Sequence, residues 1–234
     1  MQLKVKVIGK YGRYCPADGC TNCYLLQTAG GKNIVIDMGS GALSKLQKII
    51  DISLIDAVII THLHFDHMCD LGVLSYALGY LNLNKIKVYM PKNPEAIANI
   101  LNFPQFDIEY IDEGCQFCVD SVVFSFAQSP HPVETFAVNI DCNGKRIVYT
   151  SDCSDKQILT ANCKKADIVI GDACILDKDY NEKAPHISVK MLAESVPCES
   201  KLFLAHLTVG DEEEILSEAQ KYHKNAEIVK DFEV

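Results

Sequence analysis

Short segments in which apolar residues alternate with polar ones, or form β-branched runs, recur along the whole chain. Alternation is typical of a half-buried strand, and an uninterrupted apolar run bounded by turn residues is typical of a buried one. Strands are therefore predicted at 3–8, 22–28, 33–37, 55–60, 86–90, 108–112, 117–127, 136–141, 145–150, 167–171, 201–205 and, briefly, near the end of the chain. Two tight turns, Gly30-Gly31 and Asn143-Gly144, join neighbouring strands as hairpins.

Apolar residues spaced as in a helix occupy the segments between many of these strands. Helices are predicted at 42–50, 70–82, 155–163, 187–195 and 211–222. Hairpins in each half, with helices between and after them, favour two sheets that pack face to face and are covered outside by helices. The pattern thus predicts a four-layer αββα sandwich of the α/β (α+β) class. No segment has the composition of a linker, so we expect a single domain over 1–234.

Ligand-type side chains are concentrated directly after the apolar strand 55–60. The run Thr61-His62-Leu63-His64-Phe65-Asp66-His67 places three imidazoles and one carboxylate within six residues. Imidazole nitrogen and carboxylate oxygen are ligands that suit zinc, manganese or iron. Four such groups exceed what one tetrahedral ion would take from a single loop, so the sequence predicts a site for two metal ions.

Other chemically capable side chains also follow predicted strands. Asp37, Asp152, Asp172 and His206 each come directly after a strand, and the ends of these strands are expected to meet at one edge. An aspartate in such a position also commonly begins a turn or caps a helix, and for Asp37 both interpretations stay open. The remaining histidines are His131 and His186, in short loops, and His223, which has the context of a surface residue.

Composition limits the partners and the compartment. A formal charge of −9 argues against a broad nucleic-acid surface, because a long polyanion needs clustered Lys and Arg; two divalent cations would still attract a small anion. Eleven cysteines without a recognisable export signal favour reduced thiols and a cytoplasmic protein. No uncharged apolar run reaches the length of a membrane span.

The order of these residues resembles that of the metallo-β-lactamase-fold hydrolases over almost the whole chain. The resemblance rests on His62-x-His64-x-Asp66-His67, followed by His131, Asp152 and His206. Within that superfamily the chain looks most like a short form of the ribonuclease Z-type branch. Asp172-Ala173 precedes Pro185-His186-Ile187-Ser188, which is similar to that branch's acidic residue and its Gly-His-Ser-Thr segment.

The resemblance implies two divalent cations, with zinc as the first choice and manganese or iron as alternatives. Its ligands would form two sets bridged by Asp152: His62, His64 and His131 for one ion, and Asp66, His67 and His206 for the other. A hydroxide held between two cations would be the nucleophile. Asp66 would also act in catalysis, and Asp172 would orient His186 to protonate the departing oxygen. The alternative for His186 is a buried, hydrogen-bonded histidine, and Asp37 would support the ligand loop.

The resemblance also bears on the substrate. Ribonuclease Z enzymes that process transfer RNA carry a long arm between the equivalents of His131 and Asp152, whereas only twenty residues lie there in this chain. With the acidic balance, this argues against transfer RNA and favours a phosphodiesterase for a small cyclic nucleotide, cyclic phosphate or short phosphodiester. The loop 10–16 is a candidate border of the pocket, with Arg13 or Tyr14 touching substrate, although each alone is more typical of a solvated loop. A homodimer is expected because this fold often pairs.

Two other functions fit the same motif. A thioester hydrolase of the glyoxalase II kind or a lactonase uses the same His-x-His-x-Asp-His loop, and the presence of Asp172 and His186 favours a phosphodiesterase over both. An iron-dependent redox enzyme similar to persulfide dioxygenases or flavodiiron proteins is the alternative from another class. Flavodiiron relatives usually have Glu where His64 stands and carry a flavin module that 234 residues cannot hold. A metal-binding protein without catalytic activity is the third alternative.

Overall fold

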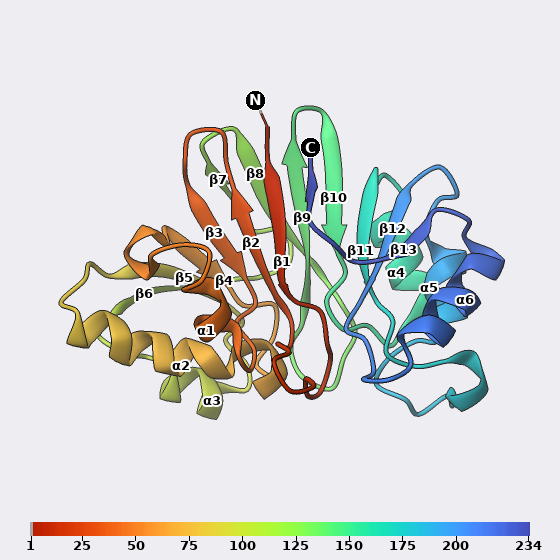
Figure 1. Cartoon of the computed structure of the whole chain (residues 1–234), viewed down its shortest axis with the longest axis horizontal. Helices are drawn as coiled ribbons and strands as arrows, with labels where there is room; N and C mark the ends of the chain where they lie inside the picture. The colour runs from red at the N-terminus through yellow and green to blue at the C-terminus, as the bar shows by residue number, and fades with distance from the viewer. Residues whose placement is uncertain (1) are drawn as a thin grey trace.

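Two mixed sheets lie face to face in the computed structural model, which describes residues 2–234 (Figure 1). The first sheet contains, in spatial order, β14 (Phe232–Glu233), β1 (Lys4–Gly9), β2 (Cys23–Gln27), β3 (Asn33–Ile36), β4 (Ala57–Ile59), β5 (Ile86–Met90) and β6 (Phe106–Tyr110). Strands β3 to β6 are parallel, and the others pair antiparallel.

The second sheet repeats this division into a parallel and an antiparallel part. Its spatial order is β13 (Ala226–Ile228), β12 (Lys201–Ala205), β11 (Ile168–Asp172), β10 (Lys145–Tyr149), β9 (Phe136–Cys142), β8 (Val122–Gln128) and β7 (Gln116–Val119). Strands β10 to β13 are parallel, and β7 to β10 form antiparallel hairpins.

Helices cover the outer face of each sheet (Figure 1). The first sheet is covered by α1 (Ala42–Leu46), α2 (Phe65–Tyr80) and α3 (Glu95–Ile100), and the second by α4 (Lys156–Cys163), α5 (Val189–Ser195) and α6 (Glu212–Tyr222). Short 3-10 helices lie at Ile52–Leu54 and Asp177–Asp179. The predicted four-layer αββα sandwich is confirmed. None of the helices within residues 2–234 has the combination of length and hydrophobicity needed to cross a bilayer.

Three apolar layers hold the sandwich together. The central layer joins the facing sides of the two sheets and contains residues such as Tyr24 and Ile36 from the first sheet and Phe124 from the second. The outer layers lie under the helices, where Leu71 of α2 and Leu192 of α5 are fully buried. Burial of this apolar area is the main favourable term in folding, and it fixes how the strand ends are oriented.

Several predicted boundaries were wrong, and each error has a local cause. The helix expected at 70–82 begins at Phe65, because the ligand-type residues of its first turn interrupt the apolar pattern. The strand expected at 117–127 is a hairpin that turns at Asp120, which adopts φ +53°, a conformation that Asp tolerates better than most residues. The helix expected at 42–50 ends at Leu46. The helix α3 was not predicted, because its six residues are too few to show a helical period.

Replacement of Phe124 by Ala tests whether the central layer dominates stability. Phe124 is fully buried between the sheets, and its ring centroid lies 5.1 Å from that of Phe117. We expect the variant to lower the free energy of unfolding by about 3–5 kcal/mol, because the cavity it leaves cannot collapse completely. Denaturant-induced unfolding measures this change. The control Tyr80→Ala, at a side chain that is 91% exposed, should change it by less than about 0.5 kcal/mol; equal effects would contradict the assignment.

Candidate metal centre

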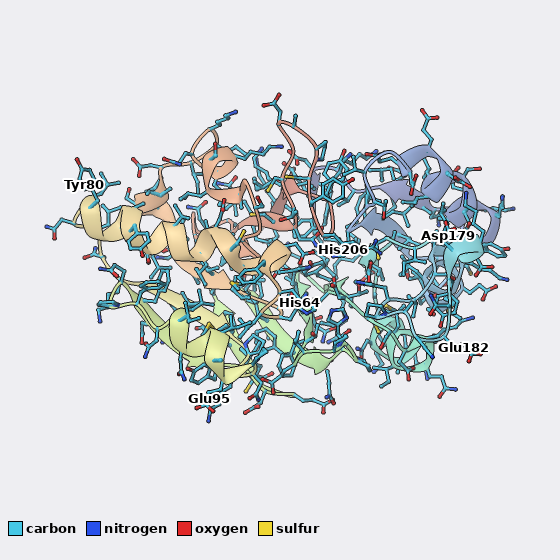
Figure 2. All side chains as sticks on the ribbon, turned by 90° about the horizontal axis from the view of Figure 1, so that it is seen from below. His64, Tyr80, Glu95, Asp179, Glu182 and His206 are labelled. Atoms are coloured by element: carbon cyan, nitrogen blue, oxygen red, sulfur yellow. The ribbon has the colours of Figure 1, made fainter. Side chains whose placement is uncertain are left out.

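The ends of five parallel strands deliver most of the predicted site residues to one edge of the two sheets, and the loops before β9 and α5 add His131 and His186. Figure 2 views the molecule from this edge and shows His64 and His206 near its middle, between the two halves. His64 is the residue before α2, with extended backbone angles, so Asp66 falls in the first turn of that helix. A carboxylate in the first turn is stabilised by the unpaired N–H groups of the helix terminus. The sequence after β4 thereby changes from strand to helix within the ligand motif.

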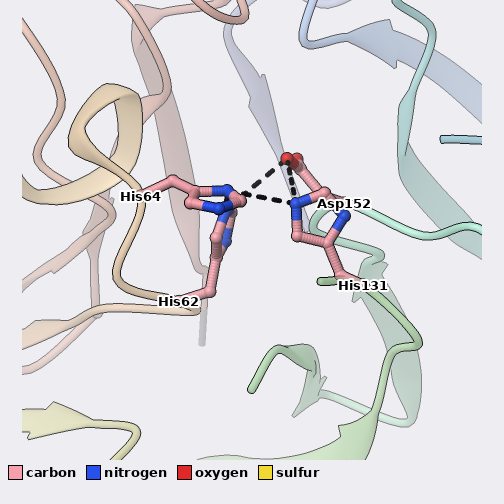
Figure 3. Close-up of side chains that lie close together, drawn as sticks. All are labelled: His62, His64, His131 and Asp152. Carbon is pink, nitrogen blue, oxygen red and sulfur yellow. Dashed lines mark hydrogen bonds and ion pairs between the residues drawn. The ribbon is translucent and has the colours of Figure 1, made fainter. Parts of the chain in front are cut away.

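One group of side chains converges on a common point (Figure 3). Nδ1 of His64 lies 3.1 Å from Nε2 of His62 and 3.1 Å from Nε2 of His131. Oδ2 of Asp152 lies 3.5 Å from Nε2 of both His62 and His131. Three ring nitrogens and one carboxylate oxygen therefore enclose a space small enough for one ion.

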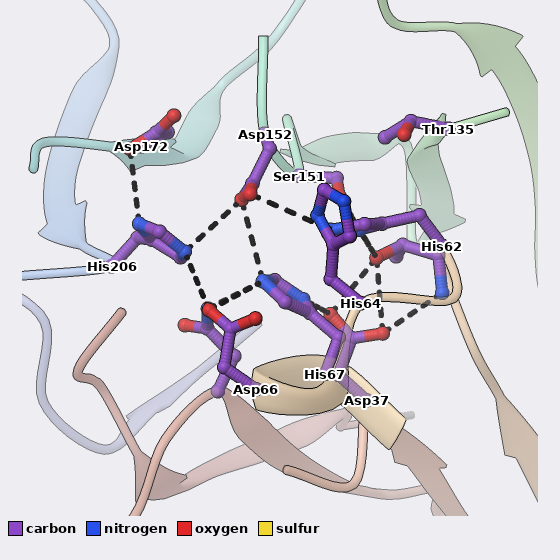
Figure 4. Close-up of polar contacts among 12 residues, drawn as sticks. Asp37, His62, His64, Asp66, His67, Thr135, Ser151, Asp152, Asp172 and His206 are labelled. Atoms are coloured by element: carbon purple, nitrogen blue, oxygen red, sulfur yellow. Dashed lines mark hydrogen bonds and ion pairs between the residues drawn. The ribbon is translucent and has the colours of Figure 1, made fainter. Parts of the chain in front are cut away.

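A second group lies beside the first and shares Asp152 with it (Figure 4). Oδ1 of Asp152 lies 3.4 Å from Nε2 of His67 and 3.3 Å from Nε2 of His206. Oδ2 of Asp66 lies 3.3 Å from Nε2 of His206 and 3.7 Å from Nε2 of His67. Each oxygen of the Asp152 carboxylate thus faces one group. The two groups are the two ligand sets that the resemblance implies.

These donors fit two divalent cations. A tetrahedral ion with bonds of about 2.0–2.1 Å to its ligands separates them by roughly 3.3 Å, which agrees with the spacing in both groups. Oδ1 of Asp152 is buried and accepts no hydrogen bond from the residues described. A buried carboxylate oxygen that accepts no hydrogen bond is costly, and a cation between it and the neighbouring rings would reduce that cost.

The electrostatics of the two groups differ. Burial lowers the pKa of His62, His64 and His131, so these rings favour the neutral form that binds metal. For His67, burial lowers the pKa, but the carboxylates of Asp152 and Asp37 outweigh it and raise the pKa to about 10. In the absence of cations, the second group therefore holds protons on its imidazoles, where metal ions would otherwise bind.

Asp37 is the residue around which the ligand loop is arranged. Its Oδ2 accepts a hydrogen bond from Nδ1 of His67 at 2.7 Å and another from the hydroxyl of Tyr149 at 2.8 Å. Its Oδ1 accepts the backbone N–H of Thr61 at 2.8 Å. With Nδ1 bonded to Asp37, the ring of His67 presents Nε2 to the second group, and a bound cation would displace the proton from that nitrogen. Of the two interpretations left open for Asp37, the structure supports the one in which it holds the ligand loop.

Three strand ends at the site have left-handed backbone conformations without being glycine. Asp37, Ser151 and His206 adopt φ values of +55°, +53° and +53°. Such conformations cost energy for most residues and persist only where the surroundings impose them. The hydroxyl of Ser151 donates to Oγ1 of Thr61 at 2.8 Å and lies 3.3 Å from Nδ1 of His62, so the strained turn also holds a predicted ligand in place.

Asp172 and His186 form a buried pair beside the two groups. Nδ1 of His186 donates to Oδ2 of Asp172 at 2.7 Å. The other oxygen of Asp172 lies 3.3 Å from Nδ1 of His206, and Cys174 belongs to the same cluster. Burial lowers the pKa of His186, but the carboxylate of Asp172 outweighs it and raises the pKa to about 11. The pair therefore keeps a proton on the imidazole next to the two groups of predicted ligands, which we call the cage.

The structure brings together every residue that the sequence predicts for the site. His223 lies elsewhere, and the expectation that it is a surface residue was wrong: it is 2% exposed, and its Nε2 lies 3.1 Å from the carbonyl oxygen of Pro197. Sequence reasoning missed Tyr149 and Ser151, whose roles depend on contacts between the sheets. Their position just before the predicted ligand Asp152 is the one signal in the sequence, and it does not distinguish them from residues that only pack.

Comparisons with known proteins agree with this geometry. The family model described as "Beta-lactamase superfamily domain" matches residues 32–206. The "Probable metallo-hydrolase YhfI" of Bacillus subtilis is 27% identical over 198 residues, which are 80% of this chain and 78% of that protein. The "Uncharacterized protein ML1173" of Mycobacterium leprae is 23% identical over 93% of this chain and 82% of its own length.

Solved structures show the same fold. The crystal structure of the metallo-β-lactamase fold protein YhfI from Bacillus subtilis superposes with a TM-score of 0.92, at 25% identity, and covers 100% of this chain and 99% of that one. The short form of human tRNase Z (ELAC1) has a TM-score of 0.73 at 21% identity and covers 100% of this chain and 98% of that one. The chain therefore belongs to the β-lactamase superfamily and is a metallo-β-lactamase-fold hydrolase, as the order of its histidines and aspartates predicts.

Proposed function

We propose that the protein is a two-zinc phosphodiesterase that hydrolyses a small cyclic nucleotide, cyclic phosphate or short phosphodiester. The observation that carries the proposal is the buried Asp172–His186 pair next to a cage in which Asp152 faces two ligand sets. Nδ1 of His186 lies 3.9 Å from Oδ2 of Asp152, so the pair adjoins the place where a substrate would react. A thioester hydrolase releases a thiolate, which has less need of a separate proton donor there.

Two divalent ions held by the predicted ligands would lower the pKa of a water molecule and neutralise charge that develops on the phosphoryl oxygens. Zinc suits the tetrahedral arrangement of imidazole and carboxylate donors. Hydrogen bonds within the chain orient the imidazole rings that would bind these ions. His131 donates its Nδ1 proton to the carbonyl oxygen of Pro185 at 2.9 Å, and His67 donates its own to Asp37, so both rings present Nε2 to the cage.

His186 is the proton donor in this proposal. Asp172 accepts the hydrogen bond from Nδ1 of the ring and stabilises the imidazolium. The proton on the second ring nitrogen, Nε2, is then available for the departing oxygen. An alkoxide is a poor leaving group, so its protonation as the P–O bond breaks lowers the barrier. After transfer, the imidazole regains a proton from solvent, and the carboxylate of Asp172 favours that return.

The segment beside the cage supports a small substrate. The twenty residues between His131 and Asp152 are used by strand β9, a tight turn at Asn143-Gly144 and strand β10. No long arm leaves this segment, and the net charge of −9 disfavours a folded RNA. The name of the Bacillus relative, a probable metallo-hydrolase, agrees with hydrolysis, and the tRNase Z neighbour shares the fold.

Turnover of three substrate classes tests the proposal directly. Zinc-loaded protein should hydrolyse bis-p-nitrophenyl phosphate, and it should turn over a thioester and a lactone at least about a hundredfold more slowly, because two cations in the proposed cage would neutralise the charge that develops on phosphoryl oxygens. Absorbance assays under identical conditions give kcat/KM for each. Activity on the thioester or lactone alone would replace the phosphodiesterase by one of those hydrolases, and oxygen consumption with one iron per chain would indicate a redox enzyme.

Replacement of Asp152 by Asn tests the shared carboxylate. The amide keeps the size of the side chain but removes the charge that faces both ligand sets. We expect the bound zinc, measured by elemental analysis after dialysis, to fall below two ions per chain, and kcat/KM to fall by at least about a hundredfold. Asp107→Asn is the control, because this exposed carboxylate pairs only with Lys87 at 2.8 Å within the described chain. Two zinc ions and full turnover in Asp152→Asn would contradict the bridging role.

The leaving-group dependence of His186→Gln separates proton donation from structural support. A dinucleotide releases a poorly leaving alkoxide and should lose about 10²–10⁴-fold in kcat. Bis-p-nitrophenyl phosphate releases a stable phenolate that needs no protonation, and it should lose less than about tenfold. Both substrates are assayed with the same variant protein at the same zinc content. Equal losses on both substrates would show that His186 supports the site without donating a proton.

A further inference from the structure

A pocket lies against the metal centre on the side of His186. It has a volume of about 440 Å³, within the range of small-molecule sites, and its lining includes Arg13, Cys174, Asp179, Asn181, Lys183, Pro185 and Asp211. Three of these residues contact or adjoin the cage. The backbone N–H of Arg13 donates to Asp66, Pro185 accepts from His131, and Cys174 lies in the cluster of Asp172 and His186. The pocket and the cage therefore share a wall.

The loop that carries Arg13 is fixed against the predicted ligands. The N–H of Gly12 donates to the carbonyl oxygen of Leu207 at 3.1 Å, and the N–H of Arg13 donates to Oδ2 of Asp66 at 2.8 Å. A Cβ at position 12 would lie 2.2 Å from Nδ1 of His206, so only glycine permits this approach. Arg13 itself adopts φ +54°, an uncommon conformation for a residue of this type. These contacts hold the start of the Arg13 side chain at the rim of the cage.

The charge of Arg13 is unpaired, in contrast to that of the other arginine. The chain contains two arginines, and Arg146 binds both carboxylate oxygens of Asp141 at 2.8 Å. The guanidinium of Arg13 contacts Sγ of Cys174 at 4.0 Å, and no carboxylate in residues 2–234 forms an ion pair with it. A guanidinium is suited to bidentate binding of phosphate or carboxylate, so its position favours an anion in the pocket.

The position of the pocket indicates which half of the substrate it receives. Pro185 lines the pocket and directly precedes His186, the proposed donor to the departing oxygen. The group attached to that oxygen must leave on the same side of the reacting phosphorus. The outer part of the pocket has Asn181, Asp179 and Asp211, whose oxygens can accept hydrogen bonds from hydroxyl or amine groups. Figure 2 shows Asp179 well away from His64 and His206.

We propose that this pocket binds the departing half of the substrate and that Arg13 binds a second anionic group carried by it. This inference rests on the proposed phosphodiesterase function and narrows its substrate to a short phosphodiester with a terminal phosphate, such as a 5′-phosphorylated dinucleotide. Water adds to the bridging phosphorus, the bond from phosphorus to the 3′-oxygen breaks, and that oxygen takes a proton from His186. Two nucleoside 5′-monophosphates result, one of which leaves with its phosphate on Arg13.

The dinucleotides pApA and ApA differ only in the terminal 5′-phosphate and provide the test. Wild-type zinc-loaded protein should prefer pApA by about tenfold or more in kcat/KM, mostly through KM, because the charged contact is absent with ApA. Arg13→Met keeps the backbone N–H bond to Asp66 and should lower kcat/KM for pApA by about tenfold, to near the value for ApA, while kcat/KM for ApA falls by a smaller factor and the zinc content is retained. Arg13→Lys should retain part of the preference, because it keeps the charge without the bidentate geometry.

Arg146→Met is the matched control, since it removes the other arginine far from the cage and should leave the preference intact. No preference in the wild type, or an equal loss on both dinucleotides in Arg13→Met, would overturn the inference while the phosphodiesterase function stood. Failure to hydrolyse bis-p-nitrophenyl phosphate and both dinucleotides would instead overturn the function. Calorimetry with 5′-AMP and adenosine tests the pocket without turnover: 5′-AMP should bind about tenfold tighter in the wild type, and the ratio should fall in Arg13→Met but not in Arg146→Met. An unchanged ratio would also overturn the inference.

Discussion

The carboxylate of Asp152 is the contact on which the arrangement of the site depends. It ends the central strand of the second sheet, and its two oxygens face ring nitrogens contributed by both halves of the fold. A buried carboxylate among five buried or half-buried imidazoles is stable only if charges balance at short range. The interface between the sheets, the strained turn before Asp152 and the loop after β4 are all consistent with that requirement. Moving either sheet by an ångström would break both ligand sets together.

Support for the ligands crosses the sandwich as well. Asp37 belongs to the first sheet, yet it accepts a hydrogen bond from Tyr149 of the second. Thr61 and Ser151, from opposite sheets, are joined by a hydrogen bond of 2.8 Å beside His62. The site is therefore held by polar contacts that exist only when the central apolar layer is fully packed. Function and stability therefore share a dependence on the packing between the two sheets.

The sequence predicted the layers and the converging strand ends because those features are local or follow from general packing rules. The motif from His62 to His67 is visible since its members are neighbours in the chain. The start of α2 was misplaced because the ligand-type residues of its first turn interrupt the apolar pattern of the helix. Tyr149 and Ser151 could not be predicted, because nothing in a buried strand distinguishes a residue that packs from one that bonds to Asp37 or Thr61. The contact between Gly12 and His206 depends on segments almost 200 residues apart.

The predicted metal ligands and the residues of the neighbouring pocket come from different segments, which explains why membership of the superfamily does not determine the substrate. The predicted ligands come from both sheets and must keep one geometry for any reaction that uses two cations. The side next to His186 comes from the loops after β1, β11 and β12, outside the strands of both sheets. Substitution of side chains there that do not contact the predicted ligands can change which group is bound without moving the donors of the cage. In this chain that side has the unpaired guanidinium of Arg13 and the ammonium of Lys183 within a strongly acidic protein, and two localised positive charges beside a divalent site attract a second anion more selectively than a broad basic surface would.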